Sequence, residues 1–289
     1  MFEYVINLII LFAIYAILGI SLNLIVGYTG LLSVSQAAFY GIGAYTTAIL
    51  LTSFGVNFFI SVILAVIVVA IISFFIGIVL SKFSGDYYAL CSLGFNAIAF
   101  SVFLNWQSLT RGPLGISGIP RPKLFDISLY TNTSFLVISV GFLLLVYAIS
   151  VFITKSSFGR VLKAIREDER AIQVFGYNTS YYKLAIFVIG SSLAAIAGSL
   201  FASYISFIDP SSFNITESIF ILSIIILGGL ANIRGSILGA LILILLPEIL
   251  RFVGFPLDVA AQMRQLIYGL LLIILMLYRP QGLVGEYKL

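Results

Sequence analysis

Residues 57–81 read NFFISVILAVIVVAIISFFIGIVLS, 25 consecutive positions without an Asp, Glu, Lys, Arg or His. A membrane-spanning helix needs about 20 mainly apolar residues, so this stretch predicts a helix that crosses a lipid bilayer. The whole chain has the same character. Of its 289 residues, 61% are hydrophobic and only 9% are charged, and the mean hydropathy is +1.18. Because soluble domains carry about 25% charged residues, a water-soluble fold is excluded.

Eight further segments with few or no charges lie on either side of this one. They cover residues 5–26, 31–54, 87–106, 134–154, 184–207, 217–232, 235–253 and 264–278. We therefore expect one all-α, polytopic transmembrane domain over residues 1–289, with about nine (8–10) helices. Residues 5–26 follow Glu3 rather than a basic stretch, and no small-residue cleavage motif comes after them, so we expect a retained span. The segment 31–54 is rich in Gly and Ser, which makes it a candidate for a broken or re-entrant helix.

The connections predict the orientation of the chain. Two of them are long, a Gly/Pro-rich stretch at 107–133 and a charged stretch at 155–183 that carries six Lys or Arg residues. The positive-inside rule places the charged stretch in the cytoplasm. Counting nine spans outward from it puts the N-terminus outside and the C-terminus in the cytoplasm, with ten of the 15 Lys and Arg residues on the cytoplasmic side.

The residue types exclude several functions. The chain has no His and a single Cys, Cys91, which excludes histidine catalysis, histidine metal sites and an intrachain disulfide. No Gly-Lys dipeptide occurs, so the phosphate-binding loop of ATPases is absent. Ionisable residues inside the spans are limited to Glu217, Glu248 and Arg251, near segment ends, and the last two are predicted to pair. We expect no catalytic residue, metal, cofactor or nucleic acid for this chain, and energy from another subunit if transport is uphill.

Residues 159–176 within the charged stretch read GRVLKAIREDERAIQVFG. Leu162, Ile165, Ile172 and Phe175 recur near helical spacing, and Gly176 stands where a helix would end in left-handed geometry. The pattern predicts a short amphipathic helix over 160–176, outside the membrane. Such a helix can dock its apolar face into a groove of a partner protein; a helix resting on lipid headgroups is an equal alternative.

At this point the sequence resembles a known family, the permease subunits of branched-chain amino acid ABC importers, LivM type. The resemblance rests on six blocks that occur in the family's order over nearly the full chain. They are residues 27–33 with 36–39 and 41–45, residues 85–89, 112–120 and 159–176, residues 227–230 with Gly235, Gly239 and 247–248, and residues 279–283. Three positions differ from the family's usual residue: Gln36 replaces a frequent His, Ala231 a frequent Gly, and Ile172 the second residue of an Ala-Ala pair.

The resemblance implies a permease of the bacterial inner (plasma) membrane that moves leucine, isoleucine and valine inward. The implied partners are a homologous LivH-type permease, two cytoplasmic ATPase subunits that bind ATP and Mg²⁺, an external (periplasmic) substrate-binding protein, and membrane lipid. It also implies that residues 155–183 hold the ATPase-coupling helix. The ATPase-coupling residues are then Gly159, Arg160, Ala164, Arg166, Glu167, Glu169, Ala171, Ile172 and Gly176.

Two Gly-interrupted stretches, 27–43 and 228–239, are candidate permeation elements, since broken helices expose backbone groups to a polar cavity. Plain helix packing is the alternative for each glycine. Polar side chains at membrane depth must face another helix or water. The candidate substrate-pathway residues are Ser33, Ser35, Gln36, Gly41, Gly43, Asn96, Gly228 and Gly229. Helix N-terminal amides could hold the carboxylate of a zwitterionic amino acid, and carbonyl ends its ammonium.

Three alternatives stay open from the sequence. The same kind of permease could serve an importer for urea, short amides or other amino acids. A self-sufficient channel or facilitator would need no ATPase and would conduct in both directions. A Na⁺-coupled carrier could bind its ion through backbone carbonyls.

Overall fold

The computed structural model describes residues 2–124, 127–128, 131–252, 266, 269–270, 273 and 281–284. Helices dominate the described residues, as predicted. The elements before the charged loop are α1 (Phe2–Thr29), α2 (Gln36–Ser53), α3 (Phe58–Leu80), α4 (Asp86–Asn105), α5 (Gln107–Thr110), η1 (Gly112–Leu114), β1 (Ile116–Ser117), β2 (Lys123–Leu124), β3 (Ile127–Ser128) and α6 (Asn132–Lys155). Those from the loop onward are α7 (Ser157–Glu167), α8 (Glu169–Val174), α9 (Thr179–Ile205), β4 (Phe207–Ile208), η2 (Pro210–Phe213), α10 (Ile215–Gly228) and α11 (Ile233–Phe252).

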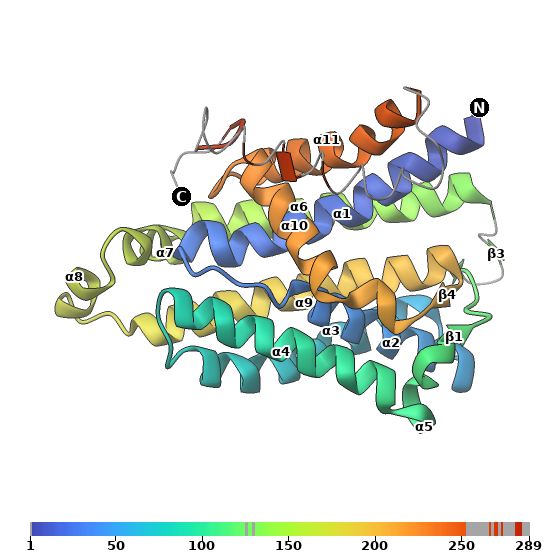
Figure 1. Cartoon of the computed structure of the whole chain (residues 1–289), viewed down its shortest axis with the longest axis horizontal. Helices are drawn as coiled ribbons and strands as arrows, with labels where there is room; N and C mark the ends of the chain where they lie inside the picture. Colours follow the sequence, from blue (N-terminus) through green and yellow to red (C-terminus); the bar gives the residue numbers. More distant parts are fainter. Residues whose placement is uncertain are drawn as a thin grey trace.

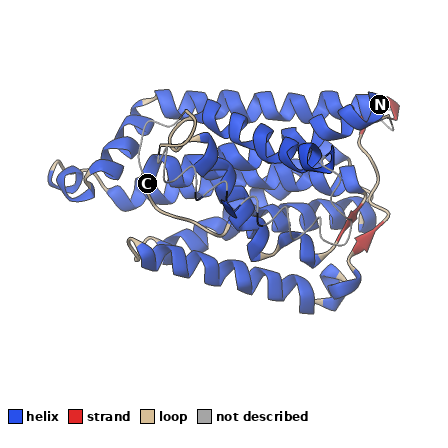
Figure 2. Cartoon of the chain, turned by 45° about the horizontal axis from the view of Figure 1, so that its top comes forward, coloured by secondary structure: helices blue, strands red, loops and turns tan. Residues whose placement is uncertain are grey.

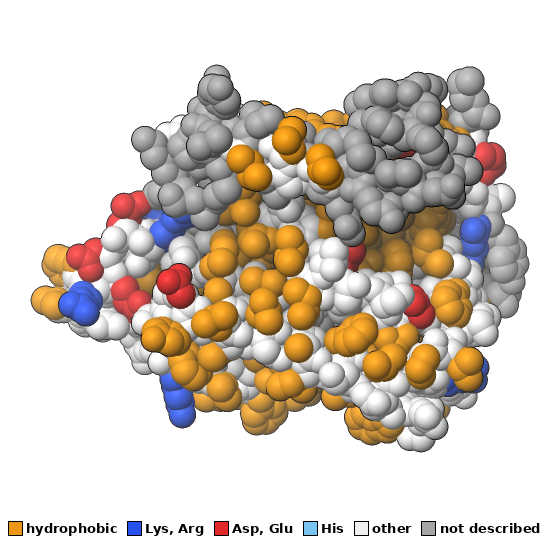
Figure 3. All heavy atoms as spheres, viewed as in Figure 1, with side chains coloured by type: hydrophobic (Ala, Val, Ile, Leu, Met, Phe, Trp, Pro, Cys, Tyr) orange, Lys and Arg blue, Asp and Glu red, His pale blue; other side chains and the backbone are white. Residues whose placement is uncertain are grey.

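The long helices run along the long axis of the molecule, and the two long connections emerge at opposite ends (Figure 1). One end carries α7 and α8. The other carries α5 and the short strands, which form two antiparallel pairs, β1 with β4 and β2 with β3; Figure 2 shows the strands confined to that end. Charged side chains gather toward both ends and hydrophobic ones cover the middle (Figure 3). This distribution is that of a body crossing a bilayer along its long axis.

Helix α9 lies at the centre and packs most extensively against α2, α3 and α1. α1 and α9 bury most of their central residues, whereas α3, α4 and α6 bury less than a third and present apolar faces outward. Small residues bring α2 and α9 together: a Cβ on Gly43 would lie 2.5 Å from the Cα of Ala195, and one on Gly198 would lie 2.1 Å from the carbonyl oxygen of Tyr40. Close backbone approach through glycine is the usual way in which helices pack inside lipid.

The expected count of about nine full-length helices is not confirmed. Among the described residues, five helices are long and apolar enough to cross a membrane, and α10 with α11 makes a sixth candidate, bent by 119°. The segment expected at 31–54 is helical only in part: residues 30–35 are not helical, and α2 begins at Gln36. Most of the segment expected at 264–278 lies outside the described residues, as do Arg279 and Pro280 of the tail motif.

Candidate functional site

The charged stretch forms two helices, so the prediction of one continuous helix over 160–176 is wrong. Asp168 has extended backbone angles (φ −152°, ψ 99°), and its carboxylate accepts hydrogen bonds from the backbone amides of Arg170 at 2.9 Å and Ala171 at 3.0 Å. An Asp in this position caps a new helix, which ends α7 at Glu167 and starts α8. Gly176 has a φ of +86°, the left-handed conformation that the sequence predicts there.

Helix α7 is anchored on the ends of α6 and α1. Gly159 is buried, and a Cβ there would lie 2.3 Å from the carbonyl oxygen of Thr154, so only glycine fits. Arg166 donates a hydrogen bond to the carbonyl of Gly27 near the end of α1, and its side chain also covers Gly30. A cation at a helix C-terminus interacts favourably with the exposed carbonyls and the helix dipole. Any displacement of α7 therefore acts directly on the end of α1.

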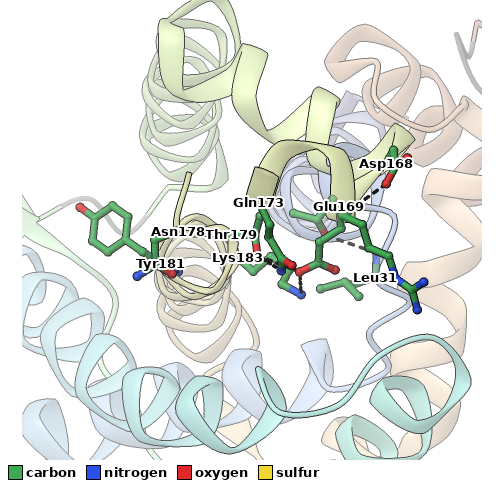
Figure 4. Close-up of polar contacts among 10 residues, drawn as sticks. Leu31, Asp168, Glu169, Gln173, Asn178, Thr179, Tyr181 and Lys183 are labelled. Atoms are coloured by element: carbon green, nitrogen blue, oxygen red, sulfur yellow. Dashed lines mark hydrogen bonds and ion pairs between the residues drawn. The ribbon is translucent and has the colours of Figure 1, made fainter. Parts of the chain in front are cut away.

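Helix α8 is tied to the first turns of α9 by a polar cluster (Figure 4). The carboxylate of Glu169 lies 2.6 Å from the Lys183 ammonium, and their side chains are 32% and 7% exposed. The same carboxylate accepts a hydrogen bond from the Thr179 hydroxyl at 2.9 Å, and that hydroxyl accepts one from Gln173 at 2.9 Å. Glu169, predicted as a coupling residue, thus faces inward.

The outer surface beyond this cluster is apolar. Val174 and Phe175 are 87% and 78% exposed, and Tyr177 and Tyr181 of the following turn are also exposed. Orange hydrophobic side chains mark this tip at the left of Figure 3, flanked by charges. The predicted apolar face is therefore divided: Leu162 and Ile165 are buried, whereas Phe175 is exposed. An exposed apolar patch with a charged rim is typical of a protein docking surface.

The remaining predicted coupling residues lie on α7 and α8. Arg160, Glu167 and Ala171 are exposed, whereas Ala164 and Ile172 are half-buried. The exposed members can contact a partner directly. Arg160 also donates a hydrogen bond to the Ser157 hydroxyl at 2.9 Å within α7.

The polar pathway candidates are fully buried near the start of α2. The hydroxyls of Ser33 and Ser35 lie 3.0 Å apart, and the Gln36 amide donates to the Ser21 hydroxyl at 2.6 Å. Sequence reasoning missed three serines that meet this segment from other helices: Ser21 on α1, Ser92 on α4 and Ser218 on α10. Ser21 and Ser92 are single hydroxyls between apolar neighbours, a signal that was present in the sequence, whereas Ser218 directly follows Thr216 and Glu217.

The predicted pathway glycines pack tightly. A Cβ on Gly41 would lie 2.7 Å from the ring of Phe103, and one on Gly228 would lie 2.0 Å from the carbonyl oxygen of Gly235. Gly229 adopts a φ of +113° at the bend between α10 and α11. Gly43 of α2 likewise packs against Ala195 of α9, so three of the four glycines serve close helix approaches and Gly229 serves the bend.

Asn23 of α1 holds the bend between α10 and α11, another role that sequence reasoning missed. Its amide nitrogen donates to the carbonyls of Gly229 at 3.3 Å and Asn232 at 3.0 Å, and its oxygen accepts from the Ala231 amide at 3.0 Å. Ala231 has a φ of +59°, a conformation that glycine adopts at lower cost. This explains why glycine suits position 231, where this sequence has alanine.

Two intramembrane carboxylates hydrogen-bond to tyrosines of α1. Glu217 accepts a hydrogen bond from the Tyr15 hydroxyl at 2.8 Å, and Glu248 accepts one from the Tyr4 hydroxyl. The predicted pairing of Glu248 with Arg251 is not tested, because the structure describes the backbone of Arg251 but not its side chain.

Comparisons with known proteins cover almost the entire chain. A family model described as "Branched-chain amino acid transport system / permease component" matches residues 4–276. The chain is 35% identical over 295 residues to the high-affinity branched-chain amino acid transport system permease protein LivM of Salmonella typhimurium, covering 94% of this chain and 68% of that protein. It is 26% identical to a probable LivM of Methanocaldococcus jannaschii (95% and 91% covered) and 25% identical to LivH of Salmonella typhimurium (94% and 91% covered). No solved structure gives a significant match.

Proposed function

Since this chain belongs to the branched-chain amino acid transport system permease family, we propose that it is a membrane-spanning permease subunit of an ABC importer for leucine, isoleucine and valine. The observation that carries the proposal is the match over 94% of the chain to a LivM permease at 35% identity. The apolar helices agree with a multi-pass membrane protein. The chain is a transport subunit rather than an enzyme.

The likeness to both LivM and LivH sequences supports pairing with a homologous LivH-type permease. We further propose two cytoplasmic ATPases, which bind ATP and Mg²⁺, and an external substrate-binding protein that delivers the amino acid. In this arrangement the α7–α8 end is cytoplasmic, the β1–β4 end is external, and the complex resides in the bacterial inner membrane, with the N-terminus outside and the C-terminus inside.

The ATPase contact is assigned to the exposed tip at the end of α8. Its apolar side chains, Val174 and Phe175, provide area to bury, and Ala171 lies beside them on the exposed side of α8. Arg160 and Glu167 are exposed charges on α7 that would orient the contact. Glu169 instead keeps α8 attached to α9 through Lys183.

Movement at this contact would be transmitted to the candidate permeation element at 27–43 through a few residues. Arg166 connects α7 to Gly27 and Gly30 at the end of α1. The non-helical residues 30–35 start at this point and lead directly to Ser35 and Gln36 at the start of α2. A shift of α7–α8 driven by ATP binding would therefore displace the first turn of α2. For this, ATP must bind the two arrangements of the complex with different affinity.

The test is uptake of radiolabelled leucine and, separately, urea into cells that express the chain with and without its ATPase and binding-protein partners. Leucine uptake only in the presence of both partners is expected. Uptake by the chain alone would replace the proposal with a facilitator or carrier, and dependence on a sodium gradient would identify the carrier. Urea uptake without leucine uptake would change the substrate class.

A second test addresses the coupling surface. Phe175→Asp places a charge on the exposed tip and is expected to abolish copurification of the ATPases, while membrane insertion persists. Tyr87→Asp, at an equally exposed position at the start of α4, is the matched control and is expected to retain them. Normal copurification with Phe175→Asp would exclude the tip as the contact.

A further inference from the structure

The N-terminus of α2 lies inside the protein, not at its surface. The chain leaves α1 at Thr29, runs through the non-helical residues 30–35, and begins the 18-residue helix α2 at Gln36. Residues 33–41 are all buried. The N-cap, Ser35, makes no side-chain capping bond. The first turn of a helix carries unpaired N–H groups and a partial positive charge, so a buried start of this kind favours an anionic group beside it.

Serine hydroxyls from α1, α4 and α10 surround the start of α2. Ser92 of α4 accepts a hydrogen bond from the backbone amide of Val34, and Ser218 of α10 accepts one from Ala37, both at 2.9 Å. A serine hydroxyl can donate as well as accept. Within the described part of the chain, the Ser218 hydroxyl proton has no acceptor. It is therefore available to a further group at the same place.

Several buried polar atoms beside this turn have no hydrogen-bond partner among the described residues. They are both amide atoms of Asn96, the amide oxygen of Gln36 and the Tyr40 hydroxyl, and all three side chains are fully or almost fully buried. Asn96 follows Ser92 by one turn of α4, so both lie on the same helix face, and Ser92 contacts Val34. The rings of Phe39 and Phe95 are 5.1 Å apart, which places Asn96 level with the first turn of α2.

The unsatisfied polar groups include both hydrogen-bond donors and hydrogen-bond acceptors. The donors are the Asn96 nitrogen and the Ser218 hydroxyl, and the amides of the first α2 turn add the partial positive charge of a helix N-terminus. Acceptors come from the Gln36 and Asn96 oxygens and the Tyr40 hydroxyl. Glu217, next to Ser218, adds a carboxylate that accepts from Tyr15 at 2.8 Å. Buried polar groups are expected to be paired, and a molecule with an acceptor end and a donor end pairs both sets.

We infer that the first turn of α2 is the membrane-embedded subsite that receives the carboxylate of an α-amino acid, with Asn96 and Ser218 donating to it and Gln36 and Tyr40 accepting from the ammonium group. The inference rests on the proposed function for the identity of the solute. No Lys or Arg takes part, so the hold is weak, which suits a site that must release its ligand. Arg166 connects α7 to the end of α1, from which residues 30–35 lead to this turn.

The experiment uses the assembled importer with Cys91→Ala, so that added cysteines are unique. Asn96→Cys and Ser218→Cys probe the subsite. Ser150→Cys, on α6, is the control, because Ser150 is equally buried and its hydroxyl also lacks a partner among the described residues. Each complex is treated during ATP turnover with anionic sulfonatoethyl or cationic trimethylammonioethyl methanethiosulfonate. Labelling rates are normalised to those of a free thiol and repeated with leucine or isopentylamine, which is leucine without its carboxylate.

We expect labelling at positions 96 and 218 at least tenfold faster than at 150, with the anionic reagent favoured roughly two- to fivefold by the helix N-terminus. Leucine should protect and isopentylamine should not. In complexes that import leucine, absence of labelling at both positions, preference for the cationic reagent, or equal protection by the two compounds overturns the inference. If the parent complex imports no leucine, the proposed function fails separately, and anion-selective labelling still supports an anion subsite at this turn.

Discussion

Replacing Glu169 with Gln removes the counter-charge of Lys183, a lysine whose side chain is only 7% exposed. An ion pair on an open surface is worth about 0.2–1 kcal/mol, whereas removing one partner of a buried pair costs about 3–5 kcal/mol. Glu169 keeps 32% of its side-chain surface exposed, which places this pair between the two limits. We expect Glu169→Gln to reduce the free energy that holds α8 on α9 by about 1.5–3 kcal/mol.

Replacing Lys183, the other partner of the ion pair, has a smaller expected effect on the attachment of α8. Lys183→Met removes the buried ammonium and leaves a carboxylate that water can reach, so we expect a loss of about 0.5–1 kcal/mol. In the double variant no charge is left buried without a partner. The two substitutions should therefore be non-additive, with a coupling energy of about 1–2.5 kcal/mol in a double-mutant cycle.

Tryptic cleavage after Arg170 in the detergent-purified protein measures the detachment of α8. When opening and closing are fast relative to cleavage, the rate follows the population of the open form, and about 1.4 kcal/mol corresponds to a tenfold change. Glu169→Gln should accelerate cleavage roughly 10- to 150-fold and Lys183→Met roughly two- to fivefold. Glu167→Gln, an exposed carboxylate two residues earlier, is the control and should change the rate less than twofold.

Two results would refute this reasoning. If Lys183→Met accelerates cleavage as much as Glu169→Gln, the burial of the ammonium is not the source of the effect. If the single changes are additive within about 0.3 kcal/mol, the 2.6 Å contact does not hold α8 in solution.

Three further predictions follow from the packing. Gly198→Leu should prevent folding, because its Cβ would lie 2.1 Å from the Tyr40 carbonyl oxygen. Gly94→Ala, which has open space around it, should instead raise the free energy of unfolding by about 0.5–1 kcal/mol. A monodisperse Gly198→Leu protein in size-exclusion chromatography would contradict the first expectation. Asp168→Ala removes the cap of α8 and should weaken that helix by about 0.5–2 kcal/mol, seen as faster amide hydrogen exchange in α8; unchanged exchange would show that the cap is dispensable. Arg166→Ala should lower ATP-dependent leucine uptake about tenfold, the value of one charge-assisted hydrogen bond, with the ATPases still copurifying; full uptake would exclude this link from coupling.

Several features follow from the sequence because they depend on composition and on local pattern. A stretch such as 57–81 has no charged side chain and few polar ones, so its place in lipid is decided by its residues alone, and α3 occupies residues 58–80 of it. The separation of the charged stretch 155–183 from the apolar body and the left-handed turn at Gly176 are also local. Ser33, Ser35 and Gln36 were identified as buried polar groups for the same reason, since lipid tolerates no unpaired hydroxyl or amide.

Other features depend on contacts between residues far apart in the chain, which a pattern does not contain. Helical periodicity continues through residue 168, and only the capping geometry of Asp168 divides α7 from α8. Whether Glu169 faces a partner or the interior was decided by Lys183, fourteen positions later on another helix. The serines that meet the start of α2 come from α1, α4 and α10, and the glycines near them serve close helix contacts. Membrane residence was determined by transfer free energy, which adds residue by residue, whereas these pairings required the helices to be packed in three dimensions.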